Sequence, residues 1–150
     1  MIDRGHIGFT TAPSTVTVDA WRVKLFCQAV GETDTVYWDE AAARAAGHPA
    51  CPLPPTYLTS IEGEHFSSAA LLRVLQVPLA GVLHAEQAFE HHAPVHVGDL
   101  VEVSREVTDI VNKKDGAMTF IVVDTRYRVG TALAATSRQT IVVRRQRAAA

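Results

Sequence analysis

Three side chains that could take part in chemistry lie close together in residues 29–38, which read AVGETDTVYW. Glu32 and Asp34 carry carboxylates, and Tyr37 carries a phenol. A carboxylate can accept or deliver a proton, whereas a phenol, with a pKa of about 10, is a poor base near neutral pH and serves better as a hydrogen-bond donor. Two interpretations are open: a polar turn between two helices, where Asp and Glu are ordinary, or a loop that holds an acid and a phenol over a substrate.

The imidazole best placed for acid–base chemistry belongs to His84, in the segment VLHAEQAFEH at residues 82–91. If this segment is a strand, its alternation places His84 and Glu86 on one face. The carboxylate could then orient the imidazole, as general acid–base sites often require. The alternative is a histidine on a polar surface or at a subunit interface.

Three further histidines, His91, His92 and His96, invite a metal interpretation, but their spacing does not favour it. Neighbouring strand residues point to opposite faces, and Pro94 interrupts the segment. No carboxylate or cysteine completes a convincing set of ligands. We therefore expect neither a metal site nor another cofactor.

The composition predicts a folded globular protein that binds neither nucleic acid nor membranes. Of the 150 residues, 47% are hydrophobic and 20% are charged, and the net charge is −2. No apolar run approaches the roughly 18 residues of a spanning helix, and the N-terminus lacks the pattern of a signal peptide. Cys27 and Cys51 form no CxxC motif, so we expect two reduced thiols in a cytoplasmic protein. We expect one domain over residues 1–150.

The elements that must position these side chains divide the chain into a helical first half and a strand-rich second half. Apolar periodicity with flanking Gly or Pro predicts helices over residues 20–30, 39–47, 56–66 and 67–77. Alternation predicts strands over 14–18, 100–113, 117–129 and 132–144, and another that begins at 81 and is broken at Pro94 and Gly98. We expect a four-strand antiparallel meander in the second half, with a helix covering one face, which is an α+β architecture. Its exposed edges could pair with a second copy or a homologous chain.

Three segments narrow this architecture to one family. They read FCQAVGETDTVYWDEAAARAAG (26–47), PLPPTYLTSI (52–61) and LHAEQAFEHHAPVHVGDLVEV (83–103). In this order they resemble the MaoC-like dehydratases of the R-specific enoyl-CoA hydratase superfamily, in particular the N-terminal, or fatty-acid-synthase-like, dehydratase domain. The resemblance covers about residues 10–145. It implies a hot-dog fold, in which a curved antiparallel sheet wraps around a long central helix, and a homodimer or a heterodimer with a homologous hot-dog chain.

The resemblance also implies a reaction: reversible addition of water across the 2,3-double bond of an acyl thioester, carried by coenzyme A or acyl carrier protein, in fatty acid metabolism. Active R-specific hydratases carry an Asp and a His five residues apart in a Gly-Asp-x-Asn-Pro-x-His motif. At those positions this chain has Glu32 and Tyr37, so the usual dyad is absent. The pattern resembles the supporting subunit of mycobacterial-type heterodimeric dehydratases, whose partner chain contributes the Asp and the His.

Glu32, Tyr37 and His84 are the candidate catalytic residues. If the chain is active alone, His84 or Glu32 handles the proton while Tyr37 orients water. Tyr37 has the alternative of a buried aromatic ring whose hydroxyl finds one partner. The candidate substrate-binding residues are Asp34, Pro55, Thr56, Tyr57 and Glu86. In this family the start of the central helix faces the thioester carbonyl, so the N–H groups of Thr56 and Tyr57 are expected to point at its oxygen.

Three functions are compatible with these residues. The first is a hydro-lyase component acting on enoyl or (R)-3-hydroxyacyl thioesters. The second is a non-catalytic acyl-binding subunit of a heterodimeric dehydratase. The third is a hot-dog acyl-CoA thioesterase, which has the right fold but no motif that favours it.

Overall fold

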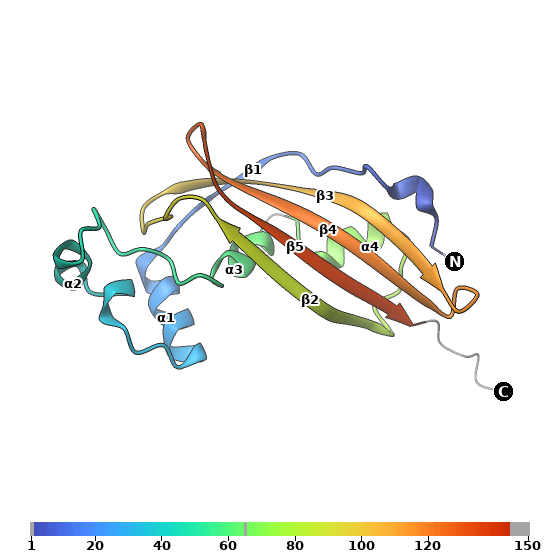
Figure 1. The fold of residues 1–150 in the computed structure, drawn as a ribbon, viewed down its shortest axis with the longest axis horizontal. Helices are drawn as coiled ribbons and strands as arrows, with labels where there is room; N and C mark the ends of the chain where they lie inside the picture. Colours follow the sequence, from blue (N-terminus) through green and yellow to red (C-terminus); the bar gives the residue numbers. More distant parts are fainter. Residues whose placement is uncertain (1, 65, 145–150) are drawn as a thin grey trace.

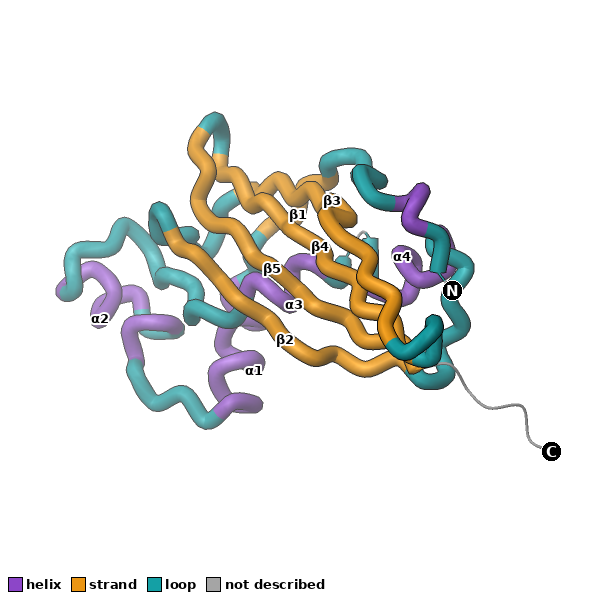
Figure 2. Tube along the Cα trace, turned by 45° about the vertical axis from the view of Figure 1, so that its right-hand side comes forward, coloured by secondary structure: helices purple, strands orange, loops and turns teal. Residues whose placement is uncertain are grey.

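A curved antiparallel sheet of five strands wraps around two short helices on its inner face (Figures 1 and 2). This computed structural model describes residues 2–64 and 66–144. The strands are β1 (Ser14–Thr17), β2 (Val82–His91), β3 (Leu100–Lys113), β4 (Met118–Val129) and β5 (Ala132–Arg144). Their order is β1-β3-β4-β5-β2, and every neighbouring pair is antiparallel.

The order of the strands differs from the predicted four-strand meander. Strands β3, β4 and β5 do form a meander, but β2 pairs with β5 instead of β3, and β1 adds a fifth strand beside β3. The connection from β2 to β3, residues 92–99, is too long for a tight hairpin and contains Pro94, which cannot donate to a strand ladder. The chain therefore crosses to the far side of the meander, and β2 becomes an edge strand.

The first helix has the predicted bounds, and the other three helices are shorter than predicted. They are α1 (Ala20–Val30), α2 (Glu40–Ala45), α3 (Leu58–Glu62) and α4 (Ser68–Val74), with 3-10 turns η1 (Arg4–His6) and η2 (Thr35–Tyr37). The long central helix implied by the resemblance is divided into α3 and α4, because Ser67 caps a new helix by accepting a hydrogen bond from the N–H of Ala70 at 3.2 Å. Helices α1 and α2 lie beyond one end of the sheet (Figure 1).

Two separate hydrophobic clusters form the core. The cluster nearer α1 contains Val23, Tyr57, Leu58, Ile61, Val103, Tyr127 and Ala135. The other cluster, under α4, contains Leu71, Leu72, Val107, Ile110, Ile121, Val123 and Ile141. Each fully buried Leu or Ile contributes about 1.5–3 kcal/mol relative to an exposed side chain, so both clusters hold the inner helices firmly on the sheet.

The structure also bears on membrane-spanning helices and on the state of the two cysteines. Within the described ranges, no helix is both long enough and apolar enough to cross a membrane. Cys27 and Cys51 are buried free thiols, as predicted. Burial raises the pKa of both thiols, so they are protonated near neutral pH.

Candidate functional site

In the loop after α1, the carboxylates of Glu32 and Asp34 accept hydrogen bonds from backbone N–H groups of the same loop. Helix α1 ends at Gly31, which adopts φ +74°, and the chain then turns outward. The Oε1 atom of Glu32 accepts the N–H groups of Thr33 and Asp34, at 2.8 and 2.9 Å. In the same way, Oδ1 of Asp34 accepts the N–H of Val36 at 3.0 Å and starts η2. Both acids therefore satisfy backbone donors that would otherwise be left free in an exposed turn.

Tyr37 ends η2 and packs, half-buried, against the cluster nearer α1. Burial raises the pKa of its phenol, and the negative charges of Glu32 and then Asp34 raise the pKa further. The phenol is therefore neutral at physiological pH and carries an O–H group that can donate a hydrogen bond. It lines a pocket of about 360 Å³ together with Ala20, Trp21, Lys24, Trp38, Glu40, Ala50, Cys51 and Val97.

The predicted pairing of His84 with the Glu86 carboxylate is wrong. A β-bulge lies between the two residues: His84 pairs with Ile141 and Glu86 with Thr140, which leaves Ala85 as the extra residue. Since directly paired residues share a face, His84 faces the inner side with Ile141, while Glu86 faces the outer side. The Nε2 atom of His84 lies 3.0 Å from the backbone oxygen of Glu86 instead. Because β2 begins at the end of the sheet away from α1, His84 does not meet the loop of Glu32 (Figure 1).

The turn before α3 also differs from the prediction. The N–H of Tyr57 donates to the carbonyl of Pro54 at 3.0 Å, so it is not free to bind a thioester oxygen. The ring of Tyr57 is buried and meets Phe26 edge-on, with 5.3 Å between the ring centroids. Pro55 and Thr56 are exposed in this turn. The turn therefore anchors α3 against α1.

A buried carboxylate that was not among the predicted site residues lies at the end of α3. Glu62 is 6% exposed, and its Oε1 accepts hydrogen bonds from the hydroxyl of Tyr127, from Oγ of Ser137 at 2.5 Å, and from Nε2 of Gln87 at 3.4 Å. These three donors come from β4, β5 and β2, so one carboxylate ties α3 to three strands. Burial, and then the negative charge of Glu62, raise the pKa of Tyr127 far above its usual value.

Arg105 completes this network from β3. Its Nη2 lies 4.0 Å from Oε2 of Glu62 and donates to Oε1 of Gln139 at 2.9 Å. Its Nη1 donates to the carbonyl of Phe66 at 3.0 Å, between the two inner helices. Burial lowers the pKa of Arg105, while Glu62 and then Tyr127 oppose this effect. The guanidinium thus satisfies backbone exposed by the break between α3 and α4.

The positions of Glu62 and Arg105 in the sequence indicate that both side chains point inward. Leu58, Ile61 and Glu62 share one face of a helix, so an acid stands on the apolar side of α3. Arg105 occupies an inward position of the alternation Val101, Val103, Arg105, Val107 in β3. A charge at an inward position is favoured only when a partner is buried with it, which links these two residues.

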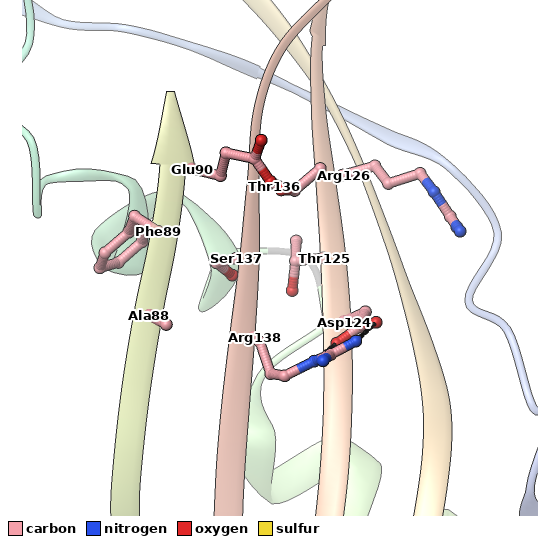
Figure 3. Close-up of a pocket in the computed structure, with 9 residues that line it drawn as sticks. All are labelled: Ala88, Phe89, Glu90, Asp124, Thr125, Arg126, Thr136, Ser137 and Arg138. Atoms are coloured by element: carbon pink, nitrogen blue, oxygen red, sulfur yellow. Dashed lines mark hydrogen bonds and ion pairs between the residues drawn. The ribbon is translucent and has the colours of Figure 1, made fainter. Parts of the chain in front are cut away.

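The outer face of the sheet carries a second pocket, also of about 360 Å³, over β2, β4 and β5 (Figure 3). Arg138 crosses from β5 to Asp124 of β4, with Nε–Oδ1 and Nη2–Oδ2 both at 2.7 Å (Figure 3). Arg126 pairs with Glu106 at 3.1 Å. Of the charged residues that line this pocket, Arg138 and Asp124 pair with each other, and Arg126 pairs with Glu106 outside the lining.

The histidines predicted not to bind a metal lie in different surroundings. His91 stacks on Phe89, with centroids 6.0 Å apart, and Nδ1 of His92 lies 4.0 Å from Glu90. Nε2 of His96 lies 3.3 Å from Nδ1 of His48. Within residues 2–64 and 66–144, no three His, Cys, Asp or Glu side chains gather closely enough to hold a metal ion.

Residues 5–135 match the family described as FAS1-like, dehydratase domain region. The chain belongs to this dehydratase-domain family. Its relatives include a UPF0336 protein of Streptomyces coelicolor, which is 33% identical in an alignment 116 residues long that covers 73% of each chain. A UPF0336 protein of Streptomyces griseus is 31% identical over 107 residues, 71% of each chain.

Solved structures confirm the hot-dog fold of this dehydratase-domain chain. The C-terminally truncated HadBC (3R-hydroxyacyl-ACP dehydratase) complex from Mycobacterium tuberculosis matches with a TM-score of 0.76 and 19% identity, over 91% of this chain and 96% of that chain. The ChsH1–ChsH2 complex from the same organism gives 0.74 and 23% identity, over 93% and 86%. The (R)-hydratase from A. caviae involved in PHA biosynthesis gives 0.68 and 24% identity, over 90% and 94%. The resemblance to MaoC-like dehydratases is confirmed as well.

Proposed function

We propose that this chain is one component of a hydro-lyase that acts on enoyl and (R)-3-hydroxyacyl thioesters of coenzyme A or acyl carrier protein. In this proposal it binds the acyl group, and a homologous partner chain supplies the Asp and the His. The observation that carries the proposal is the loop of Glu32. Two backbone N–H groups occupy Oε1 of Glu32, and Tyr37 is a neutral phenol, so the loop is a stable turn that lacks the Asp–His pair of the active hydratases.

The edge strand β2 supports a partner of the same fold. β2 is ten residues long and pairs with β5 on one side, so its other side offers backbone donors and acceptors to another strand. Leu83 of this strand is 50% exposed. HadBC and ChsH1–ChsH2, whose structures share this fold, are both complexes of two different proteins. In this proposal, the partner chain pairs along this edge of the sheet.

Reconstitution tests the proposal directly. The purified chain, a homologous chain encoded beside it and the mixture of both are each supplied with crotonyl-CoA and with a longer enoyl-CoA, and hydration of the double bond is followed. We expect turnover only in the mixture, and its loss when the partner's Asp or His is replaced. Turnover by the isolated chain that disappears in Glu32→Gln would instead show an autonomous enzyme. Release of free CoA thiol without hydration would show a thioesterase.

A further inference from the structure

The pocket of about 360 Å³ beside α1 is rich in aromatic side chains. Both tryptophans of the chain, Trp21 and Trp38, line it with Tyr37, together with the small side chains of Ala50 and Cys51. Trp21 is 66% exposed, although an indole is among the side chains that gain most from burial. Three aromatic residues around one hollow, one of them open to solvent, are typical of a binding site.

Four carboxylates surround this pocket from two sides. One pair, in the loop after α1, is Glu32 and Asp34, and the other pair, at the start of α2, is Asp39 and Glu40. Burial, and then the first pair, raise the pKa of the Tyr37 phenol, which lines the pocket. Burial, and then the second pair, raise the pKa of the Cys51 thiol, which lines it as well. The negative charge of both pairs therefore reaches the groups that a ligand would contact.

Two cations stand against these four carboxylates. Nη2 of Arg44 lies 3.2 Å from Oε2 of Glu40, in an exposed pair on α2. Lys24 lines the pocket from α1, but it is exposed, so water screens its ammonium. In the described part of the chain, the cation that lies over an aromatic ring is Lys113, over Phe120, and not Lys24. The excess charge beside the aromatic rings of the pocket is therefore negative.

We propose that this pocket binds a guanidinium group, as carried by an arginine side chain. A guanidinium is planar, is more weakly hydrated than an ammonium, stacks on aromatic faces and donates hydrogen bonds to carboxylates. The pocket offers both kinds of partner, because the two indoles and Glu40 line the same hollow and the phenol oxygen of Tyr37 can accept a hydrogen bond. This inference goes beyond the proposed function and does not depend on hydro-lyase activity.

A second pocket extends this surface along α1. It has a volume of about 260 Å³, shares Trp21 with the first pocket, and is lined further by Leu25, Phe26 and Ala29. Leu25 is 56% exposed, so apolar surface continues from the indole that borders the guanidinium site. An arginine on the surface of a partner protein would bring apolar neighbours to this stretch, whereas a free guanidino compound would not. The two sources of the guanidinium therefore differ in their dependence on Leu25.

The indole N–H signals test the site, because the chain has two tryptophans and both line the pocket. In nitrogen–proton correlation NMR spectra of the full chain, we expect both signals to shift saturably with N-acetyl-arginine amide. Neither should shift with N-acetyl-citrulline amide, which has nearly the same shape but no charge. N-acetyl-lysine amide should bind more weakly than the arginine compound, because an ammonium is more strongly hydrated and cannot stack as a plane.

Two variants and one control identify the groups that bind. Trp21→Ala, with Trp38 as the remaining reporter, should weaken binding of N-acetyl-arginine amide at least about twofold, the low end for a cation over an exposed aromatic ring. Glu40→Gln keeps the shape of the side chain, removes its charge and should weaken binding as well. Asp115→Asn removes a carboxylate from the turn between β3 and β4, at the opposite end of the molecule, and should leave binding unchanged (Figure 1).

Four results would each overturn the proposal. They are the absence of saturable shifts with N-acetyl-arginine amide, equal binding of the citrulline compound, tighter binding of tetramethylammonium than of the arginine compound, and equal effects of Glu40→Gln and Asp115→Asn.

A capped leucine–arginine–leucine peptide and agmatine distinguish the two sources. If the peptide binds more tightly than N-acetyl-arginine amide and Leu25→Ala abolishes the difference, the guanidinium belongs to a protein partner. If agmatine binds as tightly as the peptide and Leu25→Ala has no effect, the site serves a free guanidino compound. Either result supports the guanidinium site. Because none of these measurements uses an acyl thioester, failure to hydrate crotonyl-CoA would count against the hydro-lyase alone.

Discussion

Oε1 of Glu62, in the last turn of α3, lies 2.5 Å from Oγ of Ser137, in the middle of β5. The same oxygen accepts the hydroxyl of Tyr127 and the amide of Gln87. A carboxylate 6% exposed is unfavourable in a core unless its hydrogen bonds are made, and here three strands provide them. This contact explains where the inner helix stops: the acid at the end of α3 holds its final turn against the sheet.

Removing this carboxylate should destabilise the chain strongly. Glu62→Ala leaves the guanidinium of Arg105 buried without its counter-charge, so we expect a loss of about 3–5 kcal/mol in the free energy of unfolding. Tyr127→Phe removes one donor and leaves the carboxylate bonded to Ser137 and Gln87, so a smaller loss of about 1–3 kcal/mol is expected. Urea denaturation measures both. Arg44→Ala, in an exposed pair on α2, should change stability by less than about 0.5 kcal/mol. Equal losses in all three variants would contradict the role of the network.

The free energy of unfolding should decrease at alkaline pH because of the phenol of Tyr127. Its pKa is raised in the folded protein, so the folded state holds the phenolic proton more tightly than the unfolded chain does. The resulting stabilisation is complete below the unfolded pKa of about 10 and decreases as the pH rises above it. The free energy of unfolding, measured by urea denaturation at several pH values between 8 and about 11.5, should decline above pH 10.

Tyr127→Phe isolates this residue from the other tyrosines. The variant should reduce the alkaline slope by about 1.4 kcal/mol per pH unit, the value for one proton. Tyr37→Phe is the comparison, since Tyr37 is only half-buried and its pKa is raised as well. An alkaline slope that is the same in wild type and Tyr127→Phe would show that this phenol is not the titrating group.

Gly81 should not tolerate a side chain. It adopts φ +86°, and a Cβ there would lie 2.5 Å from the backbone oxygen of Arg144. Gly81→Ala therefore combines a left-handed backbone with a collision against backbone, and we expect a loss of at least about 2 kcal/mol in thermal or urea unfolding. Gly98→Ala is the matched control: its φ is +92°, but no heavy atom lies within 4 Å of the added Cβ. A larger loss at Gly98 than at Gly81 would contradict the predicted collision.

Glu32 should act through its hydrogen bonds and not as a base. Glu32→Gln keeps an oxygen that can accept the N–H groups of Thr33 and Asp34, so the reconstituted mixture should retain most of its kcat. Glu32→Ala removes that acceptor, and faster amide exchange at Thr33 and Asp34 should accompany a higher KM. A loss of more than about 100-fold in kcat with Glu32→Gln would instead identify a carboxylate that handles a proton.

The long strands could be predicted from the sequence almost to the residue. β3 matches the predicted range 100–113 because its buried and exposed side chains alternate along nearly its whole length. The strand order could not be predicted, since β2 can extend the meander at either edge and the choice depends on contacts far apart in the chain. The β-bulge at Ala85 could not be predicted from the sequence either, because the segment has neither a Gly nor a Pro to mark it.

The candidate site was predicted less well than the fold. Residues 31–38 form the expected break between two helices, but the geometry of the hydrogen bonds there depends on backbone angles that residue types do not fix. His84 was wrongly paired because one inserted residue reverses the face of a strand. Glu62 and Arg105 do carry a signal in the sequence, because each is a charged residue at an inward position of its helix or strand.

The network of Glu62 and Arg105 also separates the two hydrophobic clusters. Along β3, Val103 belongs to the cluster nearer α1, Arg105 to the network, and Val107 to the cluster under α4. The loop of Tyr37 packs on the first cluster alone. Substitutions in that loop should therefore leave the packing under α4 intact, so changes at one end of the molecule are tolerated while the other end keeps the fold.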